Sequence, residues 1–420
     1  MSTLTYYKIL TAAAAPLVPL WLKLRGLRGK EAPGRIRERF GFSSYARPKG
    51  KLLWIHAASV GEANSVLALI QELRKRLPAL AILLTTGTVT SAALMKQRLP
   101  AGVTHQFAPV DTPEATERFI RHWLPDVAWF VESELWPNLI AAAQRYHCLM
   151  ALINARMSER SFRRWKKHPA AATEILSTFH ACFAQSEQDA KRLRELGAKH
   201  VVVSGNLKYD APILPCDEAE LLAMKQTLAG RSLWLAASTH PGEEAMMAEA
   251  HKKLADTLPT LLTVIVPRHP DRGTDIAREL QRFGTVALRS KKETITEVTA
   301  FYIADTLGEL GLFYRLCETV FMGGSLVKHG GQNPLEPAQL ACAVLSGPHT
   351  HNFHDIYREL AAHGGTVIVE DASGLAAELR RLFADPAARS ALQASAKNVA
   401  AQKSGSGKLI LDIFTPVLAP

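Results

Sequence analysis

The chain has 420 residues, of which 47% are hydrophobic and 21% charged, a composition that excludes a disordered protein and leaves room for two folded domains. Its net charge is +11, and much of that charge lies near the N-terminus. Five scattered cysteines without a C-x-x-C pair give no indication of a zinc site or a disulfide framework, so we expect a reducing compartment.

The N-terminal segment, residues 1–25, is predicted to anchor the chain to a membrane. Its apolar run, Ile9 to Leu22, has 14 residues, fewer than a bilayer-spanning helix needs, and Pro16 and Pro19 would interrupt a straight helix. Nine basic residues between Lys23 and Lys49 follow the run, whereas the charges of a secretory signal precede it. Basic residues in this position attract anionic lipid on the cytoplasmic side. The segment would lie in the interface or span once; a buried N-terminal helix is the alternative.

Short apolar segments alternate with helical patterns along the rest of the chain, as in parallel sheets covered on both faces. The segments predicted as strands are 52–59, 81–88, 127–133, 149–155, 180–186 and 201–206, then 233–239, 261–268, 300–305, 319–324, 343–348 and 365–370. Residues 210–222, with two prolines, read as a linker between the two sets. We therefore predict two doubly wound, Rossmann-like α/β domains, 26–209 and 223–420, the second with terminal helices. They would face a central cleft and bind ligands at the carboxyl ends of their strands.

Glu62 follows the first predicted strand, 52–59, at the point where ligands of such a sheet bind. Gly61 allows the backbone to turn there, and a glutamate at this turn could accept a proton from a bound hydroxyl. Ser59, three residues earlier, also fits the S-x-x-E capping box of a helix. The local pattern leaves both interpretations open.

Further along the first domain, Glu132 and Glu134 lie at the end of the predicted strand 127–133 and could orient a substrate. The stretch 154–168 then holds six basic residues with Phe162 and Trp165 among them. Because a membrane anchor and a second basic cluster precede it, an anionic amphiphilic partner at the membrane is favoured. Nucleic acid is disfavoured, since the chain has no recognised nucleic-acid-binding motif.

The second domain carries polar loops at its predicted strand ends, and these indicate a nucleotide site. The loops are 237–244, 266–272, 305–311 and 323–338, the last rich in glycine and followed by a helix at Pro334. The chain has no G-x-G-x-x-G and no D-x-D pair, and "KSGSGKL" (403–409) lacks the pattern of a P-loop. We therefore expect a nucleotide monophosphate or diphosphate held by basic and dipolar groups without a metal.

The motifs "SVGE", "ESELWPN", "NARMS", "GNLKYD", "STHPGEE", "VPRHP", "GGSLVKHGGQNPLEPA" and "GPHTHNF" follow one another over nearly the whole chain. Together they resemble the 3-deoxy-D-manno-octulosonic acid (Kdo) transferases of Gram-negative lipopolysaccharide synthesis. The resemblance implies an inverting GT-B glycosyltransferase that needs no cofactor or metal. Its donor would be CMP-Kdo and its acceptor a lipid A precursor (lipid IVA), at the cytoplasmic face of the inner membrane.

The same resemblance implies roles for individual residues. Glu62 would be the general base, and Glu132 and Lys208 would assist the transition state. The residues implied in CMP binding are Pro267, Arg268, His269, Leu307, Gly308, Glu309, Asn333, Pro334, Leu335 and Glu336. Two alternatives stay open: another sugar-nucleotide enzyme of this fold, such as a UDP-sugar transferase or an epimerase, and a non-enzymatic basic protein bound peripherally to a membrane.

Overall fold

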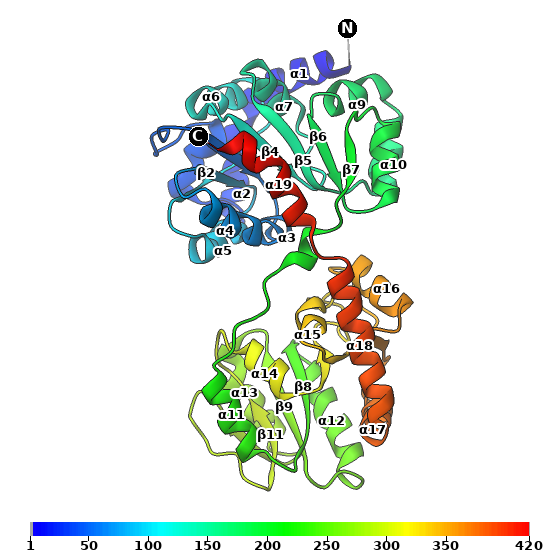
Figure 1. Cartoon of the computed structure of the whole chain (residues 1–420). Coiled ribbons are helices and arrows are strands. Elements are labelled where there is room, and N and C mark those ends of the chain that lie inside the picture. Colours follow the sequence, from blue (N-terminus) through cyan, green and yellow to red (C-terminus); the bar gives the residue numbers. More distant parts are fainter. Residues whose placement is uncertain (1–2, 420) are drawn as a thin grey trace. The chain divides into compact units, whose positions relative to one another are not determined.

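A computed structural model describes residues 3–419, which form two compact units (Figure 1). The first unit contains the chain up to Ala211 together with the residues from Lys403 onward, and the second contains Pro212 to Gln402. Each unit is built on one seven-stranded sheet in which all neighbouring strands are parallel, so the predicted α/β class is confirmed. Buried parallel strands explain the continuous apolar segments of the sequence.

The first domain has the strand order β3-β2-β1-β4-β5-β6-β7. Its strands are β1 (Leu52–His56), β2 (Ala81–Thr86), β3 (Val103–Phe107), β4 (Val127–Val131), β5 (Leu149–Ala155), β6 (Ala181–Ala184) and β7 (Val201–Val203). The order changes direction between β1 and β4, which are hydrogen-bonded neighbours although two strands separate them in sequence. In a doubly wound sheet this switch point is where the loops diverge and leave room for a ligand.

Alternate side chains of each strand enter two separate cores, one on each face of this sheet. Trp54 packs with α6 (Pro113–Trp123), α7 (Pro137–Arg145), α9 (Pro169–Leu176) and α10 (Glu187–Glu195). Ile55 packs on the opposite face with α3 (Val60–Ser65), α4 (Leu67–Arg76), α5 (Val89–Arg98) and α19 (Ser406–Leu418). Two short helical turns, η2 (Pro33–Phe40) and η3 (Leu207–Asp210), and α8 (Glu159–Lys166) complete the domain.

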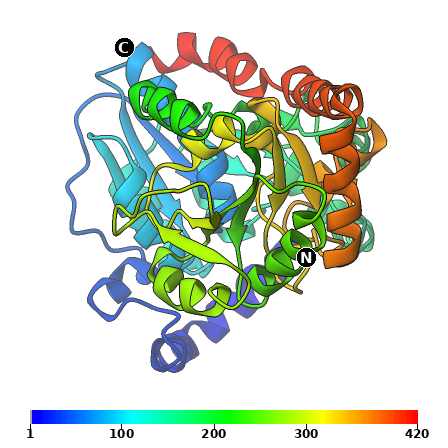
Figure 2. The same cartoon turned by 90° about the horizontal axis from the view of Figure 1, so that it is seen from below.

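The second domain has the strand order β10-β11-β9-β8-β12-β13-β14, with its switch point between β8 and β12. The strands are β8 (Ser232–Thr239), β9 (Leu261–Pro267), β10 (Thr285–Leu288), β11 (Thr299–Ile303), β12 (Thr319–Met322), β13 (Ala343–Ser346) and β14 (Val367–Ile368). Helices cover both faces of this sheet (Figure 2). They are α11 (Glu218–Thr227), α12 (Glu243–Ala255), α13 (Gly273–Leu280), α14 (Leu310–Leu316), α15 (Leu335–Gln339), α16 (His354–Ala362), α17 (Ala372–Ala384) and α18 (Pro386–Gln402), with the turn η4 (Pro270–Arg272).

The last helix, α19, corrects the predicted domain boundary at the C-terminus. We expected residues 223–420 to form the second domain, but α19 (red in Figure 1) packs on the first. Phe414 enters the first-domain core, with its ring 5.4 Å from that of Trp129. The main-chain N–H groups of Gly405 and Gly407 donate to the Asp210 carboxylate, which fixes the point where the chain returns. The predicted linker at 210–222 is also shorter than expected, because α11 begins at Glu218.

Two strands, β3 and β10, were absent from the sequence prediction. Both lie at the edge of a sheet, where one side of the strand has no neighbour. Strand β3 includes His105 and Gln106, and β10 has only four residues and starts with an exposed threonine. Edge strands are short and polar because a long apolar edge would aggregate, so they give a weak hydrophobic pattern.

The N-terminal segment forms two short helices, α1 (Thr3–Ala14) and α2 (Val18–Leu27), joined by the turn η1 (Ala15–Leu17). Pro16 and Pro19 lie at this interruption, as predicted. Among residues 3–419, no helix combines the length and the hydrophobicity needed to cross a bilayer. Only Leu22 of these helices is buried. Leu4 packs against the first-domain core, and two hydrogen bonds also attach α1: Tyr7 donates to Asp111 (2.8 Å), and Asn138 donates to Thr11 (2.9 Å).

Candidate functional site

In the first domain, carboxylates from two neighbouring strands meet at the switch point. Glu62 follows β1, and Glu132 and Glu134 follow β4. Glu132 adopts a left-handed backbone conformation (φ 57°), which turns the chain sharply at the end of its strand. Because β1 and β4 are adjacent, these loops lie side by side, although about 70 residues separate them in sequence.

Glu62 completes a capping box at the start of α3. Its main-chain N–H donates to Ser59 Oγ (3.2 Å), while its carboxylate accepts from the Ser59 hydroxyl and from the Ala58 N–H (both 2.8 Å). The side chain is 9% exposed. The hydrogen bonds therefore confirm that Ser59 and Glu62 form a capping box. It does not exclude proton transfer, because each carboxylate oxygen has a second lone pair available.

The surroundings of Glu62 favour its protonated form. Burial, then the negative charges of Glu134 and Glu132, raise the pKa of Glu62 to about 7, although the hydrogen bonds from Ser59 and Ala58 oppose the rise. Burial also acts to raise the pKa of Glu134. There, however, the His56 ring (Nε2 to Oε2, 3.7 Å) and the Trp136 indole (2.5 Å) lower it below the usual value. Glu134 thus stays ionised and repels the charge on Glu62.

The raised pKa of Glu62 predicts a pH limit on any reaction that uses it as a base. Only the deprotonated carboxylate accepts a proton, so kcat/KM should fall about tenfold per pH unit below about pH 7. Substitution Glu134→Gln removes the negative charge next to Glu62, so the fall in kcat/KM on the acidic side of the pH profile should move to lower pH. The measurement is a pH profile at saturating donor. A limb that stays near pH 7 in Glu134→Gln would contradict the electrostatic assignment.

Lys208 lies beside Glu132, with 3.8 Å between its Nζ and Glu132 Oε1. Two amides hold the Lys208 segment at the end of the sheet: Asn154 Oδ1 accepts from the Leu207 N–H (3.0 Å), and Asn206 Oδ1 accepts from the Lys208 N–H (3.0 Å). Of the implied catalytic residues, the structure thus pairs Glu132 with Lys208 and couples Glu62 electrostatically to Glu132. The sequence did not single out Asn154, whose buried position and left-handed φ of 50° mark it as a structural support.

The two predicted basic clusters prove to have mixed roles. In the N-terminal cluster, Arg25 and Arg39 both bind the buried Glu31, and Arg35 binds Glu38, so these charges are used within the fold. The exposed members are Lys23, Arg28, Lys30, Arg37 and Lys49.

The run at 154–168 contains α8, whose basic side chains are exposed. Phe162 and Trp165, the two aromatic residues among these charges, are partly buried and pack against the first-domain core. Trp165 and Arg164 also line a cavity of about 490 Å³. The amphipathic pattern of α8 therefore reflects docking on the domain, while its charges remain at the surface.

In the second domain, a fully buried carboxylate that the sequence did not distinguish organises the glycine-rich loop. Glu243, in the first turn of α12, accepts from the N–H groups of Gly324 (2.6 Å), Ser325 (3.0 Å) and Leu326 (3.0 Å), and from that of His240 (3.0 Å). It therefore joins the loop after β8 to the loop after β12 at the switch point. The signal was present in "STHPGEE", since two acidic residues open a helix there.

Histidines gather around these two loops. The His240 ring stacks on that of His329 (3.7 Å between centroids) and lies 6.3 Å from that of His269. Burial, then the neighbouring His329, His269 and Arg268, lower the pKa of His240 to about 4. The predicted Arg268 and His269 are exposed at the end of β9, beside this cluster. Neutral imidazole and exposed guanidinium groups at strand ends suit an anionic ligand.

The other implied nucleotide residues lie on two further loops. Glu309 is held by Arg289 (2.7 Å) and bonds to Thr306, so its charge is already neutralised, while Leu307 and Gly308 form an exposed turn before α14. Asn333 donates to Glu336 (3.2 Å) and caps the Leu335 N–H. The helix expected after Pro334 is only five residues long, too short for a strong helix dipole, and Leu335 is buried in the core.

Across residues 3–419, no group of three or more histidine, cysteine, aspartate or glutamate side chains is placed to hold a metal ion. The candidate functional groups of the first domain are its carboxylate and lysine cluster, and those of the second domain are its polar loops.

Comparison with known proteins identifies relatives over nearly the full length. The family model described as 3-Deoxy-D-manno-octulosonic-acid transferase (kdotransferase) matches residues 34–211. A probable mitochondrial 3-deoxy-D-manno-octulosonic acid transferase of Arabidopsis thaliana is 39% identical over 84% of this chain and 81% of its own. The 3-deoxy-D-manno-octulosonic acid transferase of Haemophilus influenzae is 34% identical over 98% of both chains. UDP-GlcNAc 2-epimerase from Neisseria meningitidis shares the fold alone, with a TM-score of 0.58, 14% identity, and coverage of 87% of this chain and 100% of its own.

Proposed function

Because this chain belongs to the 3-deoxy-D-manno-octulosonic acid (Kdo) transferase family, we propose that it transfers Kdo from CMP-Kdo to a lipid A precursor, lipid IVA, in lipopolysaccharide synthesis. The observation that supports this most directly is the cluster at the first-domain switch point. There a buried glutamate with a pKa near neutrality lies beside a second carboxylate and a lysine. A base of this kind suits the activation of a sugar hydroxyl.

The proposed reaction is a direct displacement at the anomeric carbon of Kdo. Glu62 accepts the proton of the acceptor hydroxyl as its oxygen forms the new bond, CMP leaves with the electrons of the old bond, and the anomeric configuration inverts. Lys208 is proposed to pair with the Kdo carboxylate or the departing phosphate, while Glu132 holds the lysine ammonium in place (3.8 Å).

CMP is proposed to bind in the second domain, at the loops that carry Arg268, His269, Glu309, Asn333 and Glu336. Glu309 would act there through Arg289, since that ion pair neutralises its charge. Gly308, with φ of 86°, lets the main chain turn at an exposed position where it could approach a ligand. We propose that these groups stabilise the leaving phosphate without a divalent metal.

The test is an assay with purified protein, CMP-Kdo and a tetraacylated, phosphorylated glucosamine disaccharide, run in a chelator. We expect a product whose mass has increased by whole Kdo units, and inhibition by CMP rather than UDP. Preferential inhibition by UDP would indicate a different sugar-nucleotide enzyme. Activity that is lost in the chelator and restored by magnesium would overturn the metal-free proposal.

We also propose that the protein works at the cytoplasmic face of the inner membrane, with the exposed apolar side chains of α1 and α2 in the interface. Leu10, Leu20 and Leu27 are all more than half exposed, and basic residues follow them. A helix pair with this composition fits an interfacial segment.

A variant that neutralises four charges of the basic run should have an acceptor KM about tenfold higher or more at low salt, or bind anionic vesicles correspondingly more weakly. The four residues are Arg163, Arg164, Lys166 and Lys167. Each charge near such a surface contributes on the order of 1 kcal/mol and is screened by salt. The KM for CMP-Kdo should stay constant. The measurements are kinetics with each substrate varied in turn and vesicle co-sedimentation.

The matched control also removes four charges, those of the exposed second-domain lysines Lys252, Lys253, Lys291 and Lys292. Equal effects in both variants would mean that net charge matters and the position of the run does not. If the first variant has no effect, the basic run is only a solvated helix face with no role in binding.

A further inference from the structure

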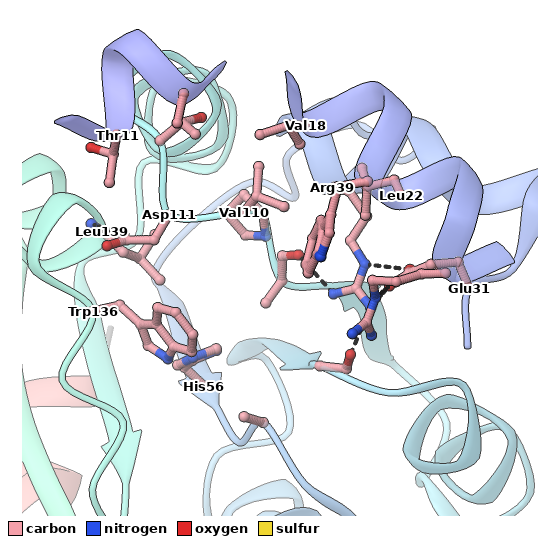
Figure 3. Close-up of a pocket in the computed structure, with 18 of the residues that line it drawn as sticks. Thr11, Val18, Leu22, Glu31, Arg39, His56, Val110, Asp111, Trp136 and Leu139 are labelled. Atoms are coloured by element: carbon pink, nitrogen blue, oxygen red, sulfur yellow. Dashed lines mark hydrogen bonds and ion pairs between the residues drawn. The ribbon is translucent and has the colours of Figure 1, made fainter. Parts of the chain in front are cut away.

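A cavity of about 520 Å³ lies in the first domain between the N-terminal helices and the carboxyl ends of the strands (Figure 3). Helices α1 and α2 form one wall, with Thr11, Val18 and Leu22. The end of β1, the loop after β3 and the start of α7 form the other, with His56, Val110 and Leu139. Its volume falls within the range of small-molecule pockets.

The charged groups in this wall are already paired, so the cavity presents little unsatisfied charge to a guest. Asp111 accepts from the Tyr7 hydroxyl (2.8 Å) and from the Leu139 N–H (2.9 Å). Arg39 binds Glu31 (2.8 Å) and donates to the Gly87 carbonyl (2.6 Å). Paired charges beside aliphatic side chains leave a space that suits an apolar guest. His56 is 2% exposed, and its Nε2 faces Glu134 Oε2 at 3.7 Å without forming a hydrogen bond.

Two residues that line the cavity also contact the carboxylates of the proposed catalytic cluster. Ala58 lines the cavity, and its N–H donates to the Glu62 carboxylate (2.8 Å). Trp136 lines it as well, and its indole binds Glu134. A molecule held in the cavity is therefore separated from the proposed base by one lining residue, Ala58.

The outer wall is amphiphilic. Trp21 lines the cavity and is nevertheless half exposed, and Leu20 on the same helix is 59% exposed. Arg25, at the same wall, has a partly exposed guanidinium, with exposed Lys23 nearby in sequence. An occupant that reaches this wall from outside meets apolar surface flanked by positive charge, which fits an anionic lipid.

We propose that this cavity binds one hydrocarbon chain of the acceptor lipid and so positions the reacting hydroxyl beside Glu62. The proposal rests on the proposed function and extends it by assigning a binding site to the acyl part of the acceptor. Burial of each additional methylene should tighten binding about fourfold until the cavity is filled. The cavity would then also discriminate between acceptor lipids by the length of their hydrocarbon chains.

The test narrows the cavity with Val18→Trp, or with Ala14→Trp should the first variant fold poorly; both residues line the outer wall. The control is Leu17→Trp, which adds the same side chain at the adjacent residue, outside the cavity lining. Each protein is assayed with an acylated phosphorylated disaccharide and with its fully deacylated counterpart. The narrowed variants should raise the KM for the acylated acceptor at least tenfold, leaving the KM for the deacylated acceptor and for CMP-Kdo unchanged. The Leu17→Trp variant should not separate the two acceptors.

A binding measurement with dansylated undecanoic acid separates failure of this inference from failure of the proposed function. We expect enhanced probe fluorescence with the unmodified protein and Leu17→Trp, and at least tenfold weaker binding to the narrowed variants. Equal probe binding by all variants, or an equal loss of activity on both acceptors, would overturn the acyl-chain site. Absence of transfer to either acceptor by the unmodified protein would overturn the proposed function, while the probe result would still decide whether the cavity takes a hydrocarbon chain.

Discussion

Substitution Glu62→Gln should reduce kcat about 10²–10⁴-fold, the usual contribution of a general base, while CMP binding and the fold persist. The amide has nearly the shape of the carboxylate but cannot accept the proton of the acceptor hydroxyl. The measurements are steady-state transfer rates at saturating CMP-Kdo, CMP affinity by calorimetry, and the melting temperature. A variant that keeps a tenth or more of the kcat would show that Glu62 acts only as a helix cap.

The capping box makes a matched control necessary, because Glu62→Gln also disturbs the start of α3. Substitution Ser59→Ala removes the cap hydroxyl but keeps the carboxylate, and should cost about 1 kcal/mol of stability. It also removes a hydrogen bond that lowers the pKa of Glu62, so its acidic limb should move to higher pH. A general base predicts a large loss of kcat only in Glu62→Gln. A purely structural role predicts similar losses in both variants.

Substitution Glu243→Ala should destabilise the second domain and abolish productive donor binding. The change leaves four main-chain N–H groups at His240, Gly324, Ser325 and Leu326 without their buried acceptor. An unsatisfied buried donor costs about 1–3 kcal/mol, and water entering the space would recover part of the total, so we expect about 3–5 kcal/mol. For a domain of this size, the melting temperature should fall by roughly 10 °C.

Calorimetry and CMP titration of Glu243→Ala test this expectation, with Glu249→Ala as the control. Glu249 lies on the same helix but is exposed, so its removal should leave both quantities nearly unchanged. If Glu243→Ala keeps the melting temperature and the CMP affinity of the unmodified protein, the four hydrogen bonds do not hold the glycine-rich loop in place.

Local sequence patterns were sufficient to predict the twelve more apolar strands and their division between two α/β units, because buried parallel strands are continuously hydrophobic. The same patterns predicted that Glu62 and Glu132 lie at strand ends, and that Pro16 and Pro19 interrupt the N-terminal helix. Both features depend only on residues close by in the sequence. The motifs identified the family, which relatives at 34–39% identity confirm.

What the sequence could not decide depends on contacts between distant residues. The apolar face of α19 fits either domain by its pattern, and only packing against Trp129 assigns it to the first. Phe162 and Trp165 have the same spacing whether they face a lipid surface or a protein core. The Glu243 carboxylate accepts hydrogen bonds from four main-chain N–H groups, three of them about 80 residues away in the sequence. Likewise, burial and Glu134 together set the pKa of Glu62, so its chemistry as a base follows from the tertiary structure and not from its own segment.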